Sequence, residues 1–213
     1  DVISEFAEGS RFQGKWKYGR TWLEDPERYV GMRVVTMIPQ CRLMDTDVQQ
    51  LEDDGLAREM DCDEGVKGVA KVFSVPEIHK GRRRRIAETV TVNECFGKDS
   101  YPRIVLPKLE ESDRISGNAR YMIQCDLAAY FDQFPLKKEV QSNFAFLAGK
   151  RRMVLTSMPM GQRQSVFVAQ CASEILADFE HEEVDCEIYI DNIRFAGNDA
   201  GKVEDAMKQL LAR

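Results

Sequence analysis

Residues 186–195 read Cys-Glu-Ile-Tyr-Ile-Asp-Asn-Ile-Arg-Phe, and this stretch decides the architecture of the C-terminal half. Apolar and polar side chains alternate on both sides of Asp191 and Asn192, which is the period-2 pattern of β-strands. Asp and Asn are favoured in tight turns because their side chains bond to nearby backbone groups. The stretch therefore predicts a β-hairpin folded about Asp191 and Asn192, with Asp191 at its tip.

The segments around this hairpin predict alternating helices and strands. Residues 120–126, Arg-Tyr-Met-Ile-Gln-Cys-Asp, indicate a buried strand that ends in the carboxylate of Asp126, and residues 153–155 indicate a short strand. Apolar residues at helical spacing predict helices over 136–147 and 203–211. A further helix is predicted after the turn at Pro159-Met-Gly161, with Val168, Ala172, Ile175 and Phe179 on one face. This order predicts an α+β fold in which helices cover one face of a mostly antiparallel sheet.

The N-terminal half contains short β-branched runs interrupted by Gly and Pro. They predict strands over 33–38, 69–75, 86–92 and 103–106. Between the second and third runs lies the basic sequence Lys80-Gly-Arg-Arg-Arg-Arg85. Because strand side chains alternate between faces, four consecutive arginines cannot all face one ligand. The planar guanidinium matches phosphate oxygens, so a hairpin carrying this run is either a phosphate clamp or a solvated surface.

Length and composition exclude several classes of protein. With 213 residues and 43% apolar side chains, the chain can bury the core of one domain or of two small subdomains. Its apolar runs are shorter than the roughly 18 to 20 residues that a membrane span needs. The six cysteines include no close pair, which disfavours zinc sites and disulfide frameworks. We expect reduced thiols, an intracellular location in cytoplasm or nucleus, and, since no initiator Met is present, a piece of a longer protein.

The charge is distributed unevenly along the sequence. The formal net charge is −6, but residues 45–64 contain nine acidic residues against Arg58 alone. The remainder of the chain is therefore slightly basic. This segregation predicts an acidic insert over 45–64 beside a basic working face, so the overall negative charge does not exclude a nucleic-acid partner.

Asp126 and Asp191 stand out as a candidate site. If their strands are neighbours in the sheet, both carboxylates lie at one edge, where they repel each other unless a divalent cation lies between them. Two cations about 3.5 to 4 Å apart would activate a hydroxyl and stabilise a departing pyrophosphate. Considered singly, an Asp in a turn is usually structural, so the surrounding sequence matters.

The surrounding sequence resembles the reverse transcriptases, RNA-directed DNA polymerases. Residues 126–134, Asp-Leu-Ala-Ala-Tyr-Phe-Asp-Gln-Phe, are similar to the first palm motif of that family. Residues 158–165, Met-Pro-Met-Gly-Gln-Arg-Gln-Ser, are similar to its Pro-x-Gly segment, and residues 189–192, Tyr-Ile-Asp-Asn, to its Tyr-x-Asp-Asp hairpin. In the fingers, Arg84, Glu88 and Asn93 are similar to the series that cradles the incoming triphosphate.

The resemblance covers residues 80–195 and implies a fold and an origin. It implies fingers over 1–118, with the acidic insert at 45–64, and a palm over 119–213 whose antiparallel, ferredoxin-like sheet is covered by helices on one face. No thumb or RNase H domain is expected within these 213 residues, so a larger polyprotein is implied. The hairpin sequence is similar to that of tyrosine-recombinase-type retroelements of protozoa.

The resemblance also implies a role for particular residues. Magnesium, or manganese, would be held by two catalytic carboxylates, a backbone carbonyl and an amide: Asp126, Asp191, Leu127 and Asn192. The incoming dNTP would be contacted by Lys80, Arg84, Phe131, Gly161 and Gln162. The template and primer, RNA or DNA, would be contacted by Tyr189 and Ser165. Phe131 would select against the 2′-hydroxyl of ribonucleotides, and no membrane partner is implied.

Asn192 departs from the family pattern, which has a second Asp at this position. An amide oxygen can coordinate Mg2+ but carries no charge, so weaker metal binding, lower activity or a preference for Mn2+ is expected. The alternative is a decayed or domesticated reverse-transcriptase-like domain that binds nucleic acid or protein without catalysis. An RNA-templated RNA polymerase is disfavoured because Phe131 would exclude ribose.

Overall fold

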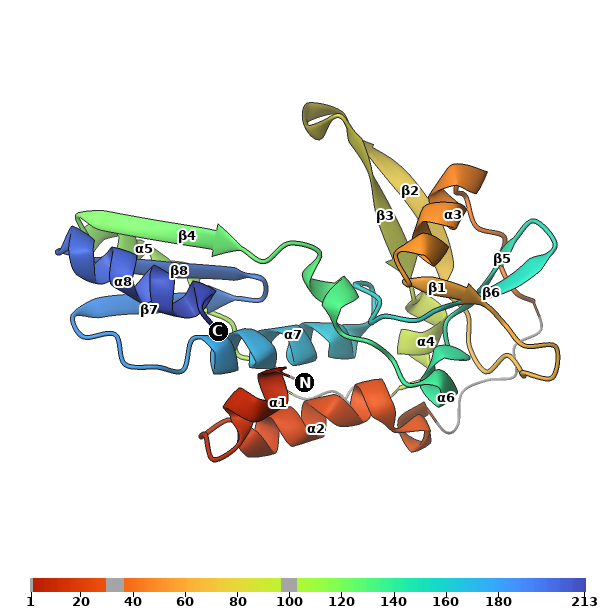
Figure 1. Cartoon of the computed structure of the whole chain (residues 1–213), viewed down its shortest axis with the longest axis horizontal. Helices are drawn as coiled ribbons and strands as arrows, with labels where there is room; N and C mark the ends of the chain where they lie inside the picture. Colours follow the sequence, from red (N-terminus) through yellow and green to blue (C-terminus); the bar gives the residue numbers. More distant parts are fainter. Residues whose placement is uncertain (1, 30–36, 97–102) are drawn as a thin grey trace. The chain divides into compact units, whose positions relative to one another are not determined.

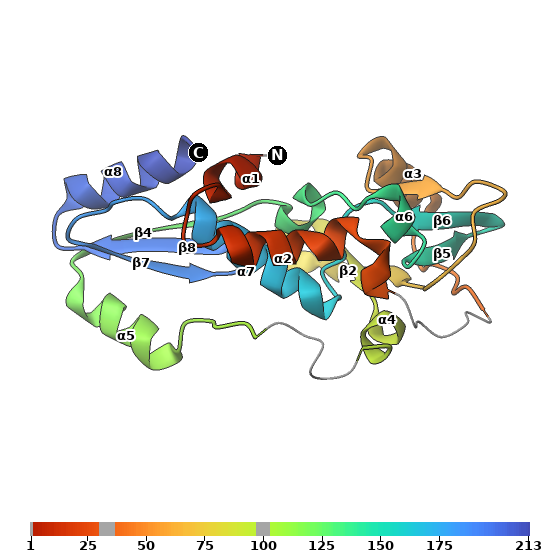
Figure 2. The same cartoon turned by 90° about the horizontal axis from the view of Figure 1, so that it is seen from below.

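The protein is described by a computed structural model that covers residues 2–29, 37–96 and 103–213 (Figures 1 and 2). It contains two compact units made from interleaved segments. The first unit comprises Asp1–Gly19, Arg103–Tyr130 and Val166–Arg213, and the second comprises Arg20–Pro102 and Phe131–Ser165. The fingers–palm boundary at residue 118 stays a prediction. Within the described residues, no helix combines the length and apolar character needed to cross a membrane.

The first unit is built on an antiparallel sheet of three strands. The strands are β4 (Tyr121–Asp126), β8 (Asn192–Gly197) and β7 (Val184–Tyr189), in the order β4-β8-β7. β7 and β8 form the predicted hairpin, and β4 pairs along the whole of β8. β4 is an edge strand with exposed and half-buried residues in alternation. The strand predicted over 120–126 is present, but the expectation that it is buried was wrong, because the sheet places only one face of β4 against a core.

Helices lie on both faces of this sheet (Figure 2). α8 (Ala200–Leu211) packs Val203 and Leu210 into a core with Ile193 and Phe195 of β8. On the other face, Arg194 donates to Ser112 of α5 (Leu109–Asn118) at 3.2 Å. The expectation that helices cover one face only was therefore wrong. Polar residues on alternate positions of the strands give the second face its own helix contact.

Three further helices contribute to the first unit. They are α1 (Val2–Ala7), α2 (Gln13–Glu24) and α7 (Arg163–Leu176). α2 and α7 also contribute residues to the second unit. Tyr18 meets Phe167 edge to face, with ring centroids 5.7 Å apart. α7 is the helix predicted after the Pro159-Met-Gly161 turn, but it ends at Leu176, before Phe179.

The second unit contains a three-stranded and a two-stranded antiparallel sheet (Figure 1). The three-stranded sheet consists of β1 (Ala57–Glu59), β6 (Arg151–Leu155) and β5 (Ala145–Ala148), in the order β1-β6-β5. The second is the hairpin of β2 (Lys71–Glu77) and β3 (Arg82–Glu88), which carries the arginine run. Short helical segments join these strands: η1 (Pro26–Tyr29), α3 (Asp45–Asp53), η2 (Ile78–Lys80), α4 (Val90–Glu94), η4 (Tyr130–Gln133) and α6 (Lys138–Gln141).

Some elements of the second unit differ from the expectations. The helix predicted over 136–147 was wrong, since α6 ends at Gln141 and β5 begins at Ala145. Ala145 packs with Met60 and Val154, so strand pairing with β6 overrides the helical spacing of the apolar residues. The strand predicted over 86–92 ends at Glu88, and residues 103–106 form no strand. Most of the strand predicted over 33–38 lies outside the described residues.

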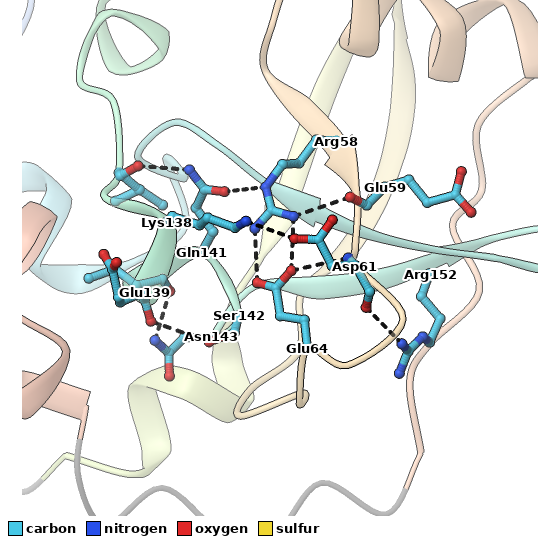
Figure 3. A network of polar contacts seen from close by, with 12 residues as sticks. Arg58, Glu59, Asp61, Glu64, Lys138, Glu139, Gln141, Ser142, Asn143 and Arg152 are labelled. Carbon is cyan, nitrogen blue, oxygen red and sulfur yellow. Dashed lines mark hydrogen bonds and ion pairs between the residues drawn. The ribbon is translucent and has the colours of Figure 1, made fainter.

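The acidic segment 45–64 is part of the second unit's sheet and ion-pair network. β1 pairs with β6, and Arg151 of β6 bonds to Glu52 and Glu59. Figure 3 shows a second group, in which Arg58 holds Glu64 with two bonds of 2.9 and 2.8 Å. The hydrogen bonds from Arg58 lower the pKa of the Glu64 carboxyl. Basic residues of the same unit therefore neutralise much of the acidic segment.

Candidate active site

Asp126 and Asp191 come together at one edge of the first unit's sheet. Asp126 is the last residue of β4 and pairs with Asn192, the first residue of β8. The next backbone amide, that of Leu127, donates to the carbonyl of Asp191 at 2.8 Å. The prediction that the two strands are neighbours, with both aspartates at one edge, is confirmed. Two residues 65 positions apart in the sequence are thus joined by adjacent backbone pairing.

The two carboxylates have no basic partner among the residues described. Neither Asp126 nor Asp191 forms an ion pair there with Lys or Arg. The acidic residues of the second unit, such as Glu64, are by contrast held by arginine. Two neighbouring carboxylates without a protein cation suit a divalent metal ion.

The protein supplies few further ligands of that kind. The described residues contain no group of three or more His, Cys, Asp or Glu side chains able to share a metal ion. The two aspartates would thus need backbone carbonyl, water or substrate oxygens to complete a coordination sphere. Mg2+ is usually bound in this way, through one or two carboxylates together with phosphates and waters. The residues present therefore fit Mg2+.

The turn that carries Asp191 is strained. β7 ends at Tyr189 and β8 begins at Asn192, so the turn residues are Ile190 and Asp191. The predicted turn position was therefore one residue too late. Ile190 has a φ of 58°, a left-handed conformation that is unfavourable for a β-branched side chain. Strain of this type persists only where the surroundings determine the backbone.

Two polar residues of α7 hold this turn in place. Gln170 accepts a hydrogen bond from the amide of Ile190 at 2.7 Å and donates to the carbonyl of Ile188 at 3.2 Å. Ser173 donates to the carbonyl of Ile190 at 2.5 Å. Both side chains are buried. Their contacts satisfy the backbone groups of the strained residue next to Asp191.

Tyr130 extends this support. Its hydroxyl lies 2.9 Å from that of Ser173 and donates to the carbonyl of Ala169 at 3.4 Å. Burial raises the pKa of Tyr130, with the hydrogen bond to Ser173 opposing the shift. The hydroxyl therefore stays protonated at neutral pH. Tyr130 acts as a structural residue of the first unit, packed behind the turn.

The face of the sheet that carries the aspartates is polar. Its cross-strand rows are Asp126, Asn192 and Tyr189, followed by Gln124, Arg194 and Glu187. A hollow of about 210 Å³ is lined by Gln124, Glu187, Tyr189, Asn192 and Arg194. Tyr189, a predicted template or primer contact, is 48% exposed. Asn192, a predicted metal ligand, accepts a hydrogen bond on its amide oxygen from Gln124 at 2.7 Å.

The predicted phosphate-binding residues lie on the β2–β3 hairpin of the second unit. Arg82 and Arg84 both approach Glu77, at 2.6 and 3.9 Å, whereas Arg83 donates to Ser74. The four arginines are thus divided between the two faces, as expected for a strand. The Arg84 side chain is exposed and lies 3.9 Å from Glu77, the longer of these two ion pairs. The side chain of Lys80 lies outside what the structure describes.

Gly161, Gln162 and Ser165 are engaged within the second unit. A Cβ atom on Gly161 would lie 2.3 Å from the carbonyl oxygen of Ala87, so this position requires glycine for backbone packing. Gln162 is buried and donates to the Tyr29 hydroxyl at 2.9 Å. Ser165 is buried and donates to the carbonyl of Pro159 at 2.8 Å. These internal contacts give each residue a structural role.

Asn93 and Phe131 also lie in the second unit. Asn93 donates to the carbonyl of Gly161 at 2.9 Å and accepts from the amide of Arg163 at 3.0 Å. It thereby fixes the segment that contains Gly161. Phe131, the predicted sugar contact, is 8% exposed and lies in η4. Most of its ring is therefore packed inside the protein.

Sequence reasoning overlooked four residues that support the site. Gln170 and Ser173 lie one helical turn apart among the apolar residues of α7, and such a polar pair on a buried face is a signal for a specific partner. Gln124 lies two residues before Asp126 on β4, and Arg194 lies two residues after Asn192 on β8. Because strand side chains alternate between the two faces, Gln124 and Arg194 lie on the same face as Asp126 and Asn192. Their pairing with one another depends on the register between β4 and β8.

Comparisons with known proteins give matches among solved structures. No family model matches the chain, and no curated protein matches it. The chain is similar to the foamy viral protease-reverse transcriptase in complex with dsDNA, with a TM-score of 0.62 and 20% identity over 86% of this chain and 39% of that chain. It is also similar to the native prototype foamy virus protease-reverse transcriptase, with a TM-score of 0.60 and 16% identity over 84% of this chain and 24% of that one.

These similarities establish the fold at a coarse level. The chain has a mixed α/β fold with antiparallel sheets, similar to that of reverse transcriptases. It spans between about a quarter and two fifths of the length of these structures. The fold class predicted from the sequence is confirmed to that extent.

Proposed function

We propose that the chain is the fingers and palm of an RNA-directed DNA polymerase from a retroelement polyprotein. The observation that carries the proposal is the convergence of Asp126 and Asp191 at the paired ends of β4 and β8. The reverse-transcriptase-like fold supports it independently. In this proposal the first unit's sheet is the ferredoxin-like palm, and the β2–β3 hairpin belongs to the fingers.

The first unit supplies the metal-binding groups. Asp126 and Asp191 would hold divalent cations through their carboxylates, and the Leu127 carbonyl is a further candidate ligand. Mg2+ or Mn2+ bound there would lower the pKa of the primer 3′-hydroxyl and stabilise charge on the leaving pyrophosphate. The protein's own part is to fix both carboxylates at one sheet edge, through the β4–β8 register and the Gln170 contacts with the turn.

The second unit supplies candidate contacts for the dNTP. Arg84 would neutralise phosphate charge with its exposed guanidinium, and Lys80 is a second candidate for this role. Phe131 would exclude the 2′-hydroxyl of ribonucleotides. Because Gly161 and Gln162 already make internal contacts, we propose that they shape this part of the fold around the nucleotide, with backbone groups as the contacting atoms.

A paired template and primer would be the macromolecular substrate. Two of the similar viral structures hold double-stranded DNA. The exposed Tyr189, beside the two aspartates, is the candidate primer contact, and Ser165 is a candidate for the template through its backbone. Further segments of a polyprotein, such as a thumb and an RNase H domain, would act together with this chain inside the cell.

Single-nucleotide incorporation tests the proposal without requiring processive synthesis. The assay uses a DNA primer annealed to RNA or DNA template, with Mg2+ or Mn2+ and one dNTP. Asp126→Asn and Asp191→Asn should each reduce incorporation by at least about 100-fold, since each removes a charged metal ligand. Asp205→Asn, on the exposed side of α8, is the matched control and should retain activity. Equal incorporation by the unsubstituted protein and Asp126→Asn would contradict the proposal.

The second candidate function is nucleic-acid or protein binding by a decayed polymerase. The observation that favours it is the engagement of the Asn192 amide oxygen by Gln124. Template–primer binding without incorporation, unchanged by Asp126→Asn under both metals, would support this alternative. Binding and incorporation measured on the same preparations therefore separate the two functions.

A further inference from the structure

Five side chains form a continuous polar path across one face of the first unit's sheet. Arg194 lies 3.5 Å from Glu187 and donates to the Gln124 oxygen from Nε at 3.3 Å and Nη2 at 3.2 Å. Gln124 Nε2 donates to Asn192 Oδ1 at 2.7 Å. Asn192 Nδ2 lies 3.5 Å from Asp191 Oδ1. The path leads from a partly buried ion pair to one of the two proposed metal ligands.

Arg194 determines which atom donates and which accepts in every hydrogen bond of this path. Arginine has only donors, so the Gln124 side chain must turn its oxygen toward Arg194. Gln124 then presents its amino group to Asn192, which must accept with its oxygen. The amino group of Asn192 is thereby left facing Asp191. Arg194 thus sets the orientation of an amide with which it has no direct bond.

The sheet register keeps the path in place. Gln124, Arg194 and Glu187 are direct cross-strand partners on β4, β8 and β7. Arg194 also donates to Ser112 of α5 at 3.2 Å. Glu187 is largely buried, with 11% side-chain exposure, so Arg194 is held by a charge that has little access to water. A guanidinium anchored in this way keeps the Gln124 oxygen turned toward it.

We propose that Gln124 and Arg194 are positioning residues that keep the Asn192 oxygen away from the metal site. The cation ligands from the protein are then Asp126, Asp191 and the Leu127 carbonyl, and Asn192 serves as a hydrogen-bond donor to Asp191. This inference rests on the proposed function, because it concerns the ligand set of the same site. It revises the expectation that Asn192 is itself a ligand.

Gln124→Glu tests the inference because it reverses the polarity of the path. A carboxylate has only acceptors, so Glu at 124 would take the Arg194 bond with one oxygen and the Asn192 amino group with the other. Asn192 would then turn its oxygen toward Asp191 and the cation. Met122→Glu is the matched control, since residue 122 lies on the same face of β4 one row further from Asp126. It adds the same charge without contacting Asn192.

Two measurements on the full chain report the outcome. In the metal-free unsubstituted protein, NOEs from the side-chain amide should place the Asn192 amino protons near the Asp191 side chain. In Gln124→Glu they should place these protons near the side chain at position 124. In Mn2+ titrations followed by EPR, Gln124→Glu should bind roughly tenfold more tightly than Met122→Glu, within the range that outer partners of metal ligands contribute. The gain should disappear when Asn192→Ala is added.

Several results would overturn the inference. These are unchanged NOEs in Gln124→Glu, equal Mn2+ affinities for Gln124→Glu and Met122→Glu, or a gain that survives Asn192→Ala, which would indicate a charge effect alone. Failure of the proposed metal site would look different. In that case Asp191→Asn would leave Mn2+ binding unchanged, while the NOE pattern would still report whether Arg194 and Gln124 orient Asn192.

Discussion

The side chain of Gln170 and the backbone of Ile190 form a two-point contact in which α7 supports the tip of the β7–β8 hairpin. Gln170 Oε1 accepts from the Ile190 amide at 2.7 Å, while its Nε2 donates to the carbonyl of Ile188 at 3.2 Å. Ile190 precedes Asp191 and has a φ of 58°. A buried amide thus determines the backbone conformation that presents a proposed metal ligand.

Gln170→Leu should weaken both stability and activity. The substitution keeps the side-chain volume but leaves the Ile190 amide without its acceptor, which costs about 1 to 3 kcal/mol of unfolding free energy. Chemical denaturation measures this loss, and single-nucleotide incorporation should fall further than the unfolded fraction explains. Gln49→Leu is the control, because the exposed Gln49 side chain donates to Asp53 on the same helix. Equal stabilities for the two variants would show that the contact is dispensable.

Ile190→Asn should stabilise the protein. Asn tolerates the left-handed conformation far better than a β-branched residue, for which the penalty is about 1 to 2 kcal/mol. We expect a rise of about 1 kcal/mol in unfolding free energy, since some of the gain is offset by lost apolar contact. Ile78→Asn makes the same change at an 83% exposed position outside the left-handed region and should have little effect. A loss of stability at residue 190 would mean that side-chain packing outweighs backbone strain.

Gly161→Ala should destabilise the second unit. The added methyl group would lie 2.3 Å from the carbonyl oxygen of Ala87, so β3 or the 159–163 segment must move. Overpacking of this kind costs about 1 to 3 kcal/mol. Gly117→Ala, in α5 with open space at its Cβ, should instead stabilise the protein by roughly 0.5 to 1 kcal/mol. Thermal unfolding of both variants measures the contrast, and a neutral Gly161→Ala would refute the close approach.

Glu64→Gln should alter the dependence of stability on pH. Hydrogen bonds from Arg58 lower the pKa of Glu64 in the folded protein, so the stabilisation is complete above the unfolded pKa of about 4.3. It is lost as the pH falls through the lower folded pKa. The stability difference between the unsubstituted protein and Glu64→Gln should therefore shrink below about pH 4.3, measured by urea unfolding from pH 3 to 7.

Glu139→Gln is the control for the pH experiment. Glu139 is exposed in the same unit and enters the network of Figure 3 through its backbone carbonyl, which accepts from Ser142. Its substitution should leave the pH profile unchanged. A difference for Glu64→Gln that stays constant down to pH 3 would show that the ion pair with Arg58 is not the cause.

The sequence determined the elements whose patterns are local. The alternation of apolar and polar residues over 186–195 identified the hairpin. Asp126 at the end of a predicted strand and Asp191 in the predicted turn identified the candidate site. It failed where tertiary contacts override periodicity. Phe144 and Leu147 continue a helical pattern in the sequence. Residues 145–148 nevertheless pair with β6 as a strand, because Ala145 and Val154 share a buried core. The ion pairs of the acidic segment with Arg151 and Arg85 could not be predicted, because they join residues far apart in the sequence.

The tertiary structure alone decided how the site is held. The sequence alone shows that Asp126 and Asp191 can bind a cation, because an ionised carboxylate is negatively charged at any position in the fold. Which neighbours orient them depends on register and helix docking, which set distances of a few ångströms between residues far apart in sequence. Gln170 meets Ile190, and Gln124 meets Asn192, only because α7 packs behind the turn and β4 pairs with β8 in one particular register.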